Sequence, residues 1–300
     1  MRTSARVLAV SCLLGSTPAF ADSLDDRLGP REIAVGEAMR GGATGASAIS
    51  LNPAGLPLNR ELVFEGGYGY RASDSASLVN VSACDSTSAM PGCFFYDYAG
   101  AAPELGGGMT GTRRTHVAGF AASRQLLPRV LVGGIAKYHD HNTDMAMEKS
   151  TSGFSFDLGA TLRLTKEIGF GVSGQNLFGE HDELHFPRAM GGGFLVRPMP
   201  LLTLGFDMRW RLDGDQTKAR YGGGAELFLR GGQNAYPIRA GALHDANLDA
   251  TYASFGIGMA TMKWGVDITG RRQVAGGDDT LILASMRFYG PREPVSGSLE

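Results

Sequence analysis

Two pairs of histidines are the residues best suited to hold a metal ion. His181 and His185 are four residues apart, and His139 and His141 lie in another polar stretch. In the H-E-x-x-H zinc motif a glutamate directly follows the first histidine and the segment is helical, whereas here the order is His-Asp-Glu-Leu-His. Because no closed ligand set is visible, the sequence favours solvated acidic loops and predicts no metal and no other cofactor.

A glycine motif and the serines were the other candidates for chemistry. Gly169-Phe-Gly-Val-Ser-Gly174 matches the G-x-G-x-x-G fingerprint, but that fingerprint needs a strand before it and a helix after it. Here the glycines lie inside a strand-like segment, where glycine more often allows close backbone approach. No serine stands in a G-x-S-x-G elbow, so we predict no catalytic residues and no enzyme. Because a triad is defined by geometry, an enzyme stays as a third alternative.

The elements that must position any site are β-strands. From residue 61 onward apolar and polar residues alternate, as in 202–211, where Phe206 and Trp210 alternate with Asp207 and Arg209. The segments run for about 9–12 residues, enough to cross a bilayer at a tilt. About 14 of them, with short and long connections in turn, predict an all-β fold, a transmembrane antiparallel β-barrel with short turns on the periplasmic side.

Alternate residues of such a barrel face its interior, which is polar by default. A hydrated or salt-bridged interior is enough to explain each charged residue. The more specific interpretation is that these residues line a translocation path. The expected lumen-lining residues are Asp157, Arg163, Asp207, Arg209, Arg211, Glu226, Asp267 and Arg271.

The N-terminus indicates export. Arg2 and Arg6 precede a short apolar run and the cleavage pattern Ala19-Phe20-Ala21, so residues 1–21 are expected to be a signal peptide. Cys12 lies in a partial lipid-attachment box, which leaves a lipoprotein as the alternative. The net charge of −2 offers no basic excess for a nucleic-acid partner.

Two cysteines remain after the signal peptide, Cys84 and Cys93. An exported chain meets an oxidising compartment, so we expect them to form a disulfide across the mouth of one hairpin. Two free thiols are the alternative.

A segment of small, almost uncharged residues, 41–56, precedes the first strand. Asn52 suits a helix cap, Pro53 the first helical position, and Gly55 an immediate end to the turn. One turn does not fold alone. A barrel of about 14 strands lies between those that side chains fill and those that leave a channel, so it has room for this segment. Inward glycines that would leave space are Gly191, Gly193, Gly222 and Gly224.

This segment, ending in Asn52-Pro53-Ala54-Gly55-Leu56 and followed by such a barrel, resembles FadL-type outer-membrane transport proteins for long-chain fatty acids and other hydrophobic compounds. Short FadL-like barrels of unassigned role look similar. The resemblance implies that the segment plugs the barrel near its periplasmic end, with Asn52, Pro53, Ala54 and Gly55 as plugging or gating residues. The sequence departs from that pattern in its short outer loops.

The expected organisation is a signal peptide (1–21), a plug segment (22–60), a barrel (61–289) and a disordered tail (290–300). It predicts passive uptake of hydrophobic or amphipathic, fatty-acid-like molecules through the outer membrane of a Gram-negative bacterium, with outer-membrane lipid around the barrel. The alternative is a structural or interaction barrel, a platform for a secretion or surface-assembly partner that the sequence does not identify.

Overall fold

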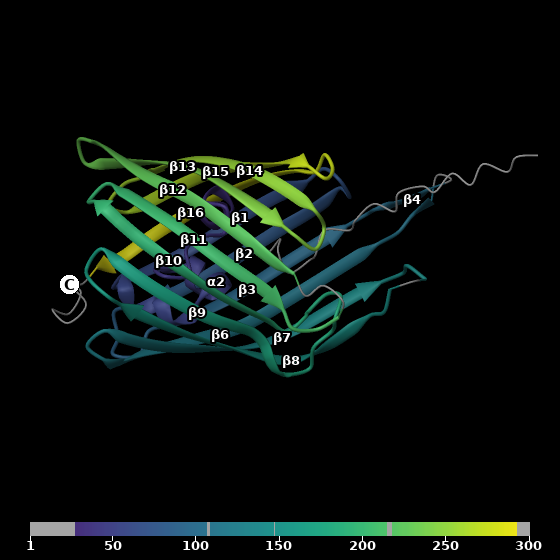
Figure 1. Cartoon of the computed structure of the whole chain (residues 1–300), viewed down its shortest axis with the longest axis horizontal. Coiled ribbons are helices and arrows are strands. Elements are labelled where there is room, and N and C mark those ends of the chain that lie inside the picture. The colour runs from purple at the N-terminus through teal and green to yellow at the C-terminus, as the bar shows by residue number, and fades with distance from the viewer. Residues whose placement is uncertain (1–27, 107–108, 147, 215–217, 293–300) are drawn as a thin grey trace, which may run out of the picture.

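Antiparallel strands close into a single barrel. The computed structural model describes residues 28–106, 109–146, 148–214 and 218–292. Fourteen strands pair in chain order, and β1 (Glu61–Arg71) closes the ring against β16 (Thr280–Arg292). Figure 1 shows the strands tilted across the barrel. The expected β-barrel of about 14 strands is confirmed.

The other barrel strands lie close to the expected ranges. They are β2 (Ala76–Asp85), β3 (Gly92–Ala101), β6 (Arg113–Leu127), β7 (Val130–Thr143), β8 (Thr151–Arg163), β9 (Ile168–Gly179), β10 (Ala189–Met199), β11 (Leu202–Arg211), β12 (Ala219–Gly231), β13 (Asn234–Asp245), β14 (Ala250–Ala260) and β15 (Trp264–Ala275).

The two ends of the barrel differ. Turns of two to four residues join β6 to β7, β8 to β9, β10 to β11, β12 to β13 and β14 to β15 at what we call the short-turn end. The opposite, long-loop end carries the longest connections, although its links from β1 to β2, β13 to β14 and β15 to β16 have four residues each, and the six-residue link from β2 to β3 lies at the short-turn end. One of the longest connections contains a small hairpin of β4 (Glu104–Gly106) and β5 (Met109–Thr110), which projects beyond the barrel in Figure 1. These strands were expected to be loop, because two or three residues are too few to show a period.

The outer wall is apolar. On β8, Phe154, Phe156 and Leu158 face outward and are exposed, whereas Ser155 and Asp157 are buried inside. The other strands repeat this alternation, and an apolar band around a closed barrel is the surface that bacterial outer-membrane barrels present to lipid. The chain is therefore an outer-membrane β-barrel. Among the described residues, no helix has the length and apolar character needed to span a bilayer.

Strand β16 is longer than expected. It continues to Arg292, which pairs with Glu61 of β1, so the boundary expected after Tyr289 is three residues short. Pairing with β1 supplies backbone partners to these residues and keeps them in the strand. The expected signal peptide and residues 293–300 of the expected tail lie outside the described residues.

The two cysteines form the expected disulfide. Cys84 of β2 and Cys93 of β3 are direct cross-strand partners, and their Cα atoms are 4.0 Å apart. The bond holds this hairpin in register at the short-turn end.

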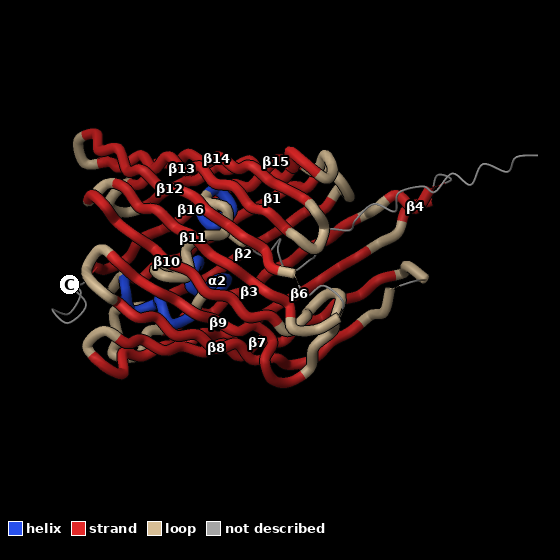
Figure 2. Tube along the Cα trace, viewed as in Figure 1, coloured by secondary structure: helices blue, strands red, loops and turns tan. Residues whose placement is uncertain are grey.

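Residues 28–60, which we call the N-terminal segment, lie inside the ring of strands (Figure 2). The segment contains α1 (Pro30–Ala34), α2 (Ala46–Leu51) and the 3-10 helix η2 (Pro53–Leu58). The expected cap is confirmed, since Asn52 precedes η2 and its Oδ1 accepts a hydrogen bond of 3.2 Å from Ala54 N.

The turn does not end at Gly55 as expected. It continues to Leu58, and Leu56 within it is fully buried. Gly55 instead serves a close contact, because a Cβ at this position would lie 1.8 Å from the carbonyl oxygen of Ala43. Glycine is required here by backbone approach and not by the end of a helix.

Candidate functional site

Glycines on the inner wall bring the N-terminal segment against the barrel backbone. A Cβ at Gly205 of β11 would lie 1.7 Å from Ala38 O, and one at Gly222 of β12 would lie 1.9 Å from Gly36 O. Gly224 likewise faces the backbone of Val35. Any side chain at these positions would displace the segment, so the wall is shaped to hold it.

The other expected glycines serve the same contact. A Cβ at Gly191 would meet the guanidinium of Arg40, and Gly193 leaves space for the carboxylate of Asp207. In the G-x-G-x-x-G stretch, a Cβ at Gly169 would lie 2.1 Å from the carbonyl oxygen of Gly41. This motif therefore lies within β9 and accommodates the segment.

Asn52 ties the segment to β8. Its side-chain nitrogen lies 2.9 Å from Thr161 Oγ1, 3.1 Å from Ala160 O and 3.0 Å from Arg40 O. Asn52 is fully buried, and Thr161 stands two residues before the end of β8. The Asn-Pro-Ala turn thus contacts the wall close to the short-turn end.

Pro53 and Ala54 complete that contact. Both lie against Gly133 of β7, where a Cβ would come within 2.6 Å of Pro53 C and 2.7 Å of Ala54 N. Gly159 of β8 gives similar room to Asn52. Three of the four residues expected to plug or gate the barrel, Asn52, Pro53 and Ala54, are thus packed against these two adjacent strands, whereas Gly55 lies against Ala43.

A buried ion pair joins the segment to β11. Arg40 Nη1 donates to Asp207 Oδ2 at 3.0 Å, and the Arg40 backbone N–H donates to the same oxygen at 3.0 Å. Arg40 Nε donates to Ser173 Oγ of β9, also at 3.0 Å, and Ser173 Oγ donates in turn to Leu51 O at 2.6 Å. Charge on the wall is thus neutralised by charge on the segment.

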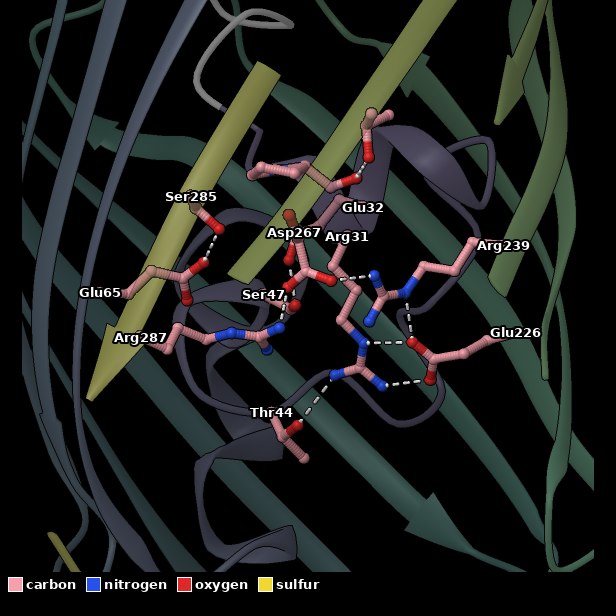
Figure 3. Close-up of polar contacts among 12 residues, drawn as sticks. Arg31, Glu32, Thr44, Ser47, Glu65, Glu226, Arg239, Asp267, Ser285 and Arg287 are labelled. Atoms are coloured by element: carbon pink, nitrogen blue, oxygen red, sulfur yellow. Dashed lines mark hydrogen bonds and ion pairs between the residues drawn. The ribbon is translucent and has the colours of Figure 1, made fainter. Parts of the chain in front are cut away.

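Figure 3 shows a second, larger network near the short-turn end. Arg31 of α1 donates to Glu226 of β12 at 2.8 and 3.0 Å, and Arg239 Nε of β13 donates to the same carboxylate at 2.6 Å. Asp267 of β15 accepts from Arg239 and from Arg287 of β16. The five side chains alternate in charge and join α1 to four strands.

Four residues of this network, Arg31, Glu226, Arg239 and Arg287, line a large cavity, which we call the charged vestibule. Its volume is about 700 Å³, and its other lining residues include those of the turns at the short-turn end. The vestibule is therefore polar and wide on the side where the short turns lie.

The remaining expected lumen residues are placed separately. Asp157 binds Lys137 Nζ of β7 at 2.6 Å, and Arg271 lies 4.9 Å from the ring centroid of Tyr252. Arg163 is half-buried and folds onto its own turn, where it donates to Lys166 O at 2.7 Å. Arg209 is buried beside the same inner cavity as Asp157, and Arg211 is half-buried at the end of β11.

Three neighbouring cavities run from the lumen to the outer wall. Two small ones, each about 30 Å³, lie beside the N-terminal segment and share Ile49 and Asp97 among their lining residues. They hold only a few waters. The third, about 470 Å³, is an apolar cleft on the outer surface, lined by Phe64, Phe94 and Phe288 among others.

Phe95 lines all three cavities. It lies on β3, is 8% exposed and faces inward, between Ser82 of β2 and Gly119 of β6. A Cβ at Gly119 would lie 2.6 Å from the Phe95 ring, so this glycine makes room for it. Phe95 therefore borders both the inner cavities and the lipid-facing cleft, and Glu65, Val81 and Ser82 also line the cleft and one inner cavity.

Sequence reasoning missed Phe95 and the charges of the segment. Arg31, Glu37 and Arg40 carry charges opposite to those of the wall residues that they contact. Because the lumen was already expected to be charged, these charges in the segment were an available signal for its contacts with the wall. For Phe95 the signal was an aromatic residue at an inward position between Cys93 and Asp97.

The expectation of solvated histidine loops is wrong. His139 and His141 are fully buried, and His185 is 5% exposed. Phe186 stacks on His139 with ring centroids 4.0 Å apart, so the loop after β9 folds over the end of β7 and excludes water.

Known proteins resemble this chain in structure. No family model matches the sequence, and no curated protein does. The CymD monoaromatic hydrocarbon channel superposes with a TM-score of 0.67 at 13% identity, covering 90% of this chain and 98% of the channel. The toluene transporter TbuX of Ralstonia pickettii gives 0.66 at 13% identity, with 89% and 99% covered.

A FadL homologue of Pseudomonas aeruginosa gives a TM-score of 0.61 at 9% identity, with 87% of this chain and 98% of the homologue covered. The chain has the FadL-type fold. Because the identities are low, the likeness establishes the arrangement of the barrel and leaves the transported compound to be argued from the site.

Proposed function

We propose that the protein is a passive outer-membrane channel for small hydrophobic compounds, with the N-terminal segment as its plug. The observation that carries the proposal is the position of Phe95, which lines two cavities beside the segment and the apolar cleft outside. A compound that enters from the long-loop end would pass beside the plug and leave through the wall at β1, β2 and β3.

The two possible exits differ in polarity. An apolar compound that left by the charged vestibule would meet Arg31, Glu226 and Arg239 and then water. One that left by the cleft would meet Phe64, Phe94 and Tyr96 and then lipid. Burial of apolar surface favours the second exit, by about 25 cal/mol per Å² removed from water. Passage down this gradient needs no energy source.

The contacts of the segment support its role as a plug. A barrel of this size would otherwise leave an open lumen. Asn52, Arg40 and Arg31 attach the segment to three different parts of the wall, at β8, β11 and β12. We propose Asn52, Pro53, Ala54 and Gly55 as the residues that hold the plug at its short-turn end.

The relatives in structure suggest the substrates to test. Two of them, CymD and TbuX, are named as a monoaromatic hydrocarbon channel and a toluene transporter, so we propose compounds of toluene size before fatty acids. Uptake of radiolabelled toluene and of palmitate by vesicles containing the purified barrel separates the two classes. We expect uptake of toluene above that of empty vesicles.

Variants at Phe95 test the route. Phe95→Ala should raise the toluene uptake rate, and Phe95→Trp should lower it, because the ring stands between the cavities. Phe154→Ala is the matched control, since it removes the same ring from the lipid-facing surface of β8, where it is 63% exposed. Uptake equal to that of empty vesicles, or a Phe95→Ala rate equal to the Phe154→Ala rate, would overturn the proposal.

A structural or interaction barrel is the second candidate. The narrowness of the inner cavities, each about 30 Å³, favours it. If neither compound binds the purified barrel and a protein co-purifies with it in stoichiometric amount, this second function replaces the first.

A further inference from the structure

Three metal-binding side chains meet at the long-loop end, away from the lumen charges. They are His141 at the end of β7, Glu148 in the loop between β7 and β8, and His185 in the loop between β9 and β10. One ligand atom from each lies within 4.8 Å of the others. Around a tetrahedral zinc ion, nitrogen and oxygen ligands lie about 3.3 Å apart, so closing this set needs only small side-chain shifts.

The two histidines of this cluster, His141 and His185, each have a ring nitrogen available to bind a metal ion. Both are at least nine-tenths buried, and Nε2 of each is buried without a hydrogen-bond partner among the described residues. An unmatched buried nitrogen is costly, and native structures pair such atoms with a partner, a water or an ion. The two rings are stacked face to face, with centroids 3.7 Å apart, which brings the imidazoles into contact.

Second contacts orient the ligands. Thr115 Oγ1 lies 2.8 Å from His141 Nδ1, which fixes that ring and leaves Nε2 for a ligand. Arg113 Nε donates to Glu148 Oε2 at 2.8 Å and a second Arg113 nitrogen donates to Oε1. A carboxylate can accept about four hydrogen bonds, so Glu148 keeps a lone pair for a cation. Such second contacts are characteristic of metal sites.

The charge state of His185 suits a cation. Burial, together with the neighbouring His141, lowers the pKa of His185 to about 4, so the imidazole is neutral at pH 7. A neutral imidazole can donate its electron pair, whereas a protonated one cannot. Two imidazoles and one carboxylate suit Zn²⁺, Cu²⁺ or Ni²⁺ rather than Ca²⁺ or Mg²⁺, which prefer oxygen.

We propose that His141, His185 and Glu148 form a binding site for a divalent transition-metal ion, with Zn²⁺ as the first candidate. A water would complete a tetrahedral set. The ion joins a strand end and two loops that are far apart in sequence, and so fastens the long-loop end of the barrel.

The test uses Zn²⁺ alone, titrated into the full-length barrel purified in detergent without a polyhistidine tag and freed of metal with a chelator. A competing fluorescent zinc indicator reports affinity and stoichiometry. We expect one saturable site, and we expect His185→Ala to weaken it by about 100-fold or more, because second contacts alone are worth 10- to 100-fold. Co²⁺ in place of Zn²⁺ should show the visible absorption of a tetrahedral ion.

Two further variants serve as controls for this experiment. His181→Ala is the matched control, because it removes a histidine from the same loop that is 37% exposed and outside the cluster. Glu148→Gln keeps the shape of the side chain, so it tests the site even if His185→Ala fails to fold. A weaker site in Glu148→Gln and an unchanged one in His181→Ala support the proposal. No saturable binding, or an equal loss in His181→Ala and His185→Ala, overturns it.

Discussion

Asn52 and Thr161 are joined by a hydrogen bond of 2.9 Å, from a side-chain amide of the N-terminal segment to a hydroxyl on the inner face of β8. The same amide nitrogen faces the carbonyl oxygens of Ala160 and Arg40. Asn52, Thr161 and Arg40 are buried, and leaving a buried polar group unmatched costs about 1–3 kcal/mol. The Asn52 side chain alone therefore fixes the Asn-Pro-Ala turn to β8 through two hydrogen bonds.

Asn52→Ala should loosen the segment. It removes the donor to Thr161 and the cap on Ala54, so we expect a loss of about 1–3 kcal/mol in the free energy of unfolding and new conductance in planar bilayers. Urea unfolding and single-channel recording measure the two effects. Asn59→Ala, at an exposed position just after η2, should change neither. A closed, fully stable Asn52→Ala barrel would contradict the anchoring role.

Asp207→Asn should lower the free energy of unfolding more than the removal of both charges of the Arg40–Asp207 ion pair does. It leaves the Arg40 guanidinium buried without its ion-pair partner, which costs about 3–5 kcal/mol. Adding Arg40→Met removes the stranded charge and should recover most of the free energy of unfolding. A double-mutant cycle on urea unfolding measures the coupling. Additive single effects would show that the pair contributes little.

Gly205→Ala should displace the segment from β11. The new Cβ would lie 1.7 Å from Ala38 O, and overpacking of this kind costs about 1–3 kcal/mol. Gly270→Ala is the matched control on β15, because a Cβ there meets nothing within 4 Å. Thermal unfolding of the two variants should separate them. Equal melting temperatures would mean that the contact is not close in solution.

The disulfide makes a chemical prediction. Alkylation of the mature barrel under denaturing conditions without reductant should leave its mass unchanged, because Cys84 and Cys93 are bonded. After reduction, two alkyl groups should be added. Intact-mass spectrometry distinguishes the outcomes, and alkylation in the unreduced sample would reveal free thiols.

The barrel could be predicted from the sequence because each strand carries its own signal. Alternation over nine residues, as in Phe154 to Leu162, is local and needs no knowledge of partners. Strand pairing then follows from chain order. The cap formed by Asn52 and Pro53 is also local, and it was predicted for the same reason.

The contacts that build the site are not local. Arg40 and Asp207 are 167 residues apart, and their pairing depends on how the segment threads the finished barrel. His141 and His185 meet only because the loop after β9 folds over the end of β7, so each of the two segments alone looks solvated. Gly55 was assigned to helix termination because its true contact, Ala43 O, comes from a separate turn.

The disulfide bears on the time scale of transport. Cys93 is two residues from Phe95 on the same face of β3, and it fixes the register in which Phe95 stands opposite Ser82. Strand β3 cannot slide along β2 near this point. On the proposed route, opening at the wall would need the rotation of one aromatic ring and no collective movement of strands on the microsecond-to-millisecond scale. Passage should then follow the rate at which compounds arrive.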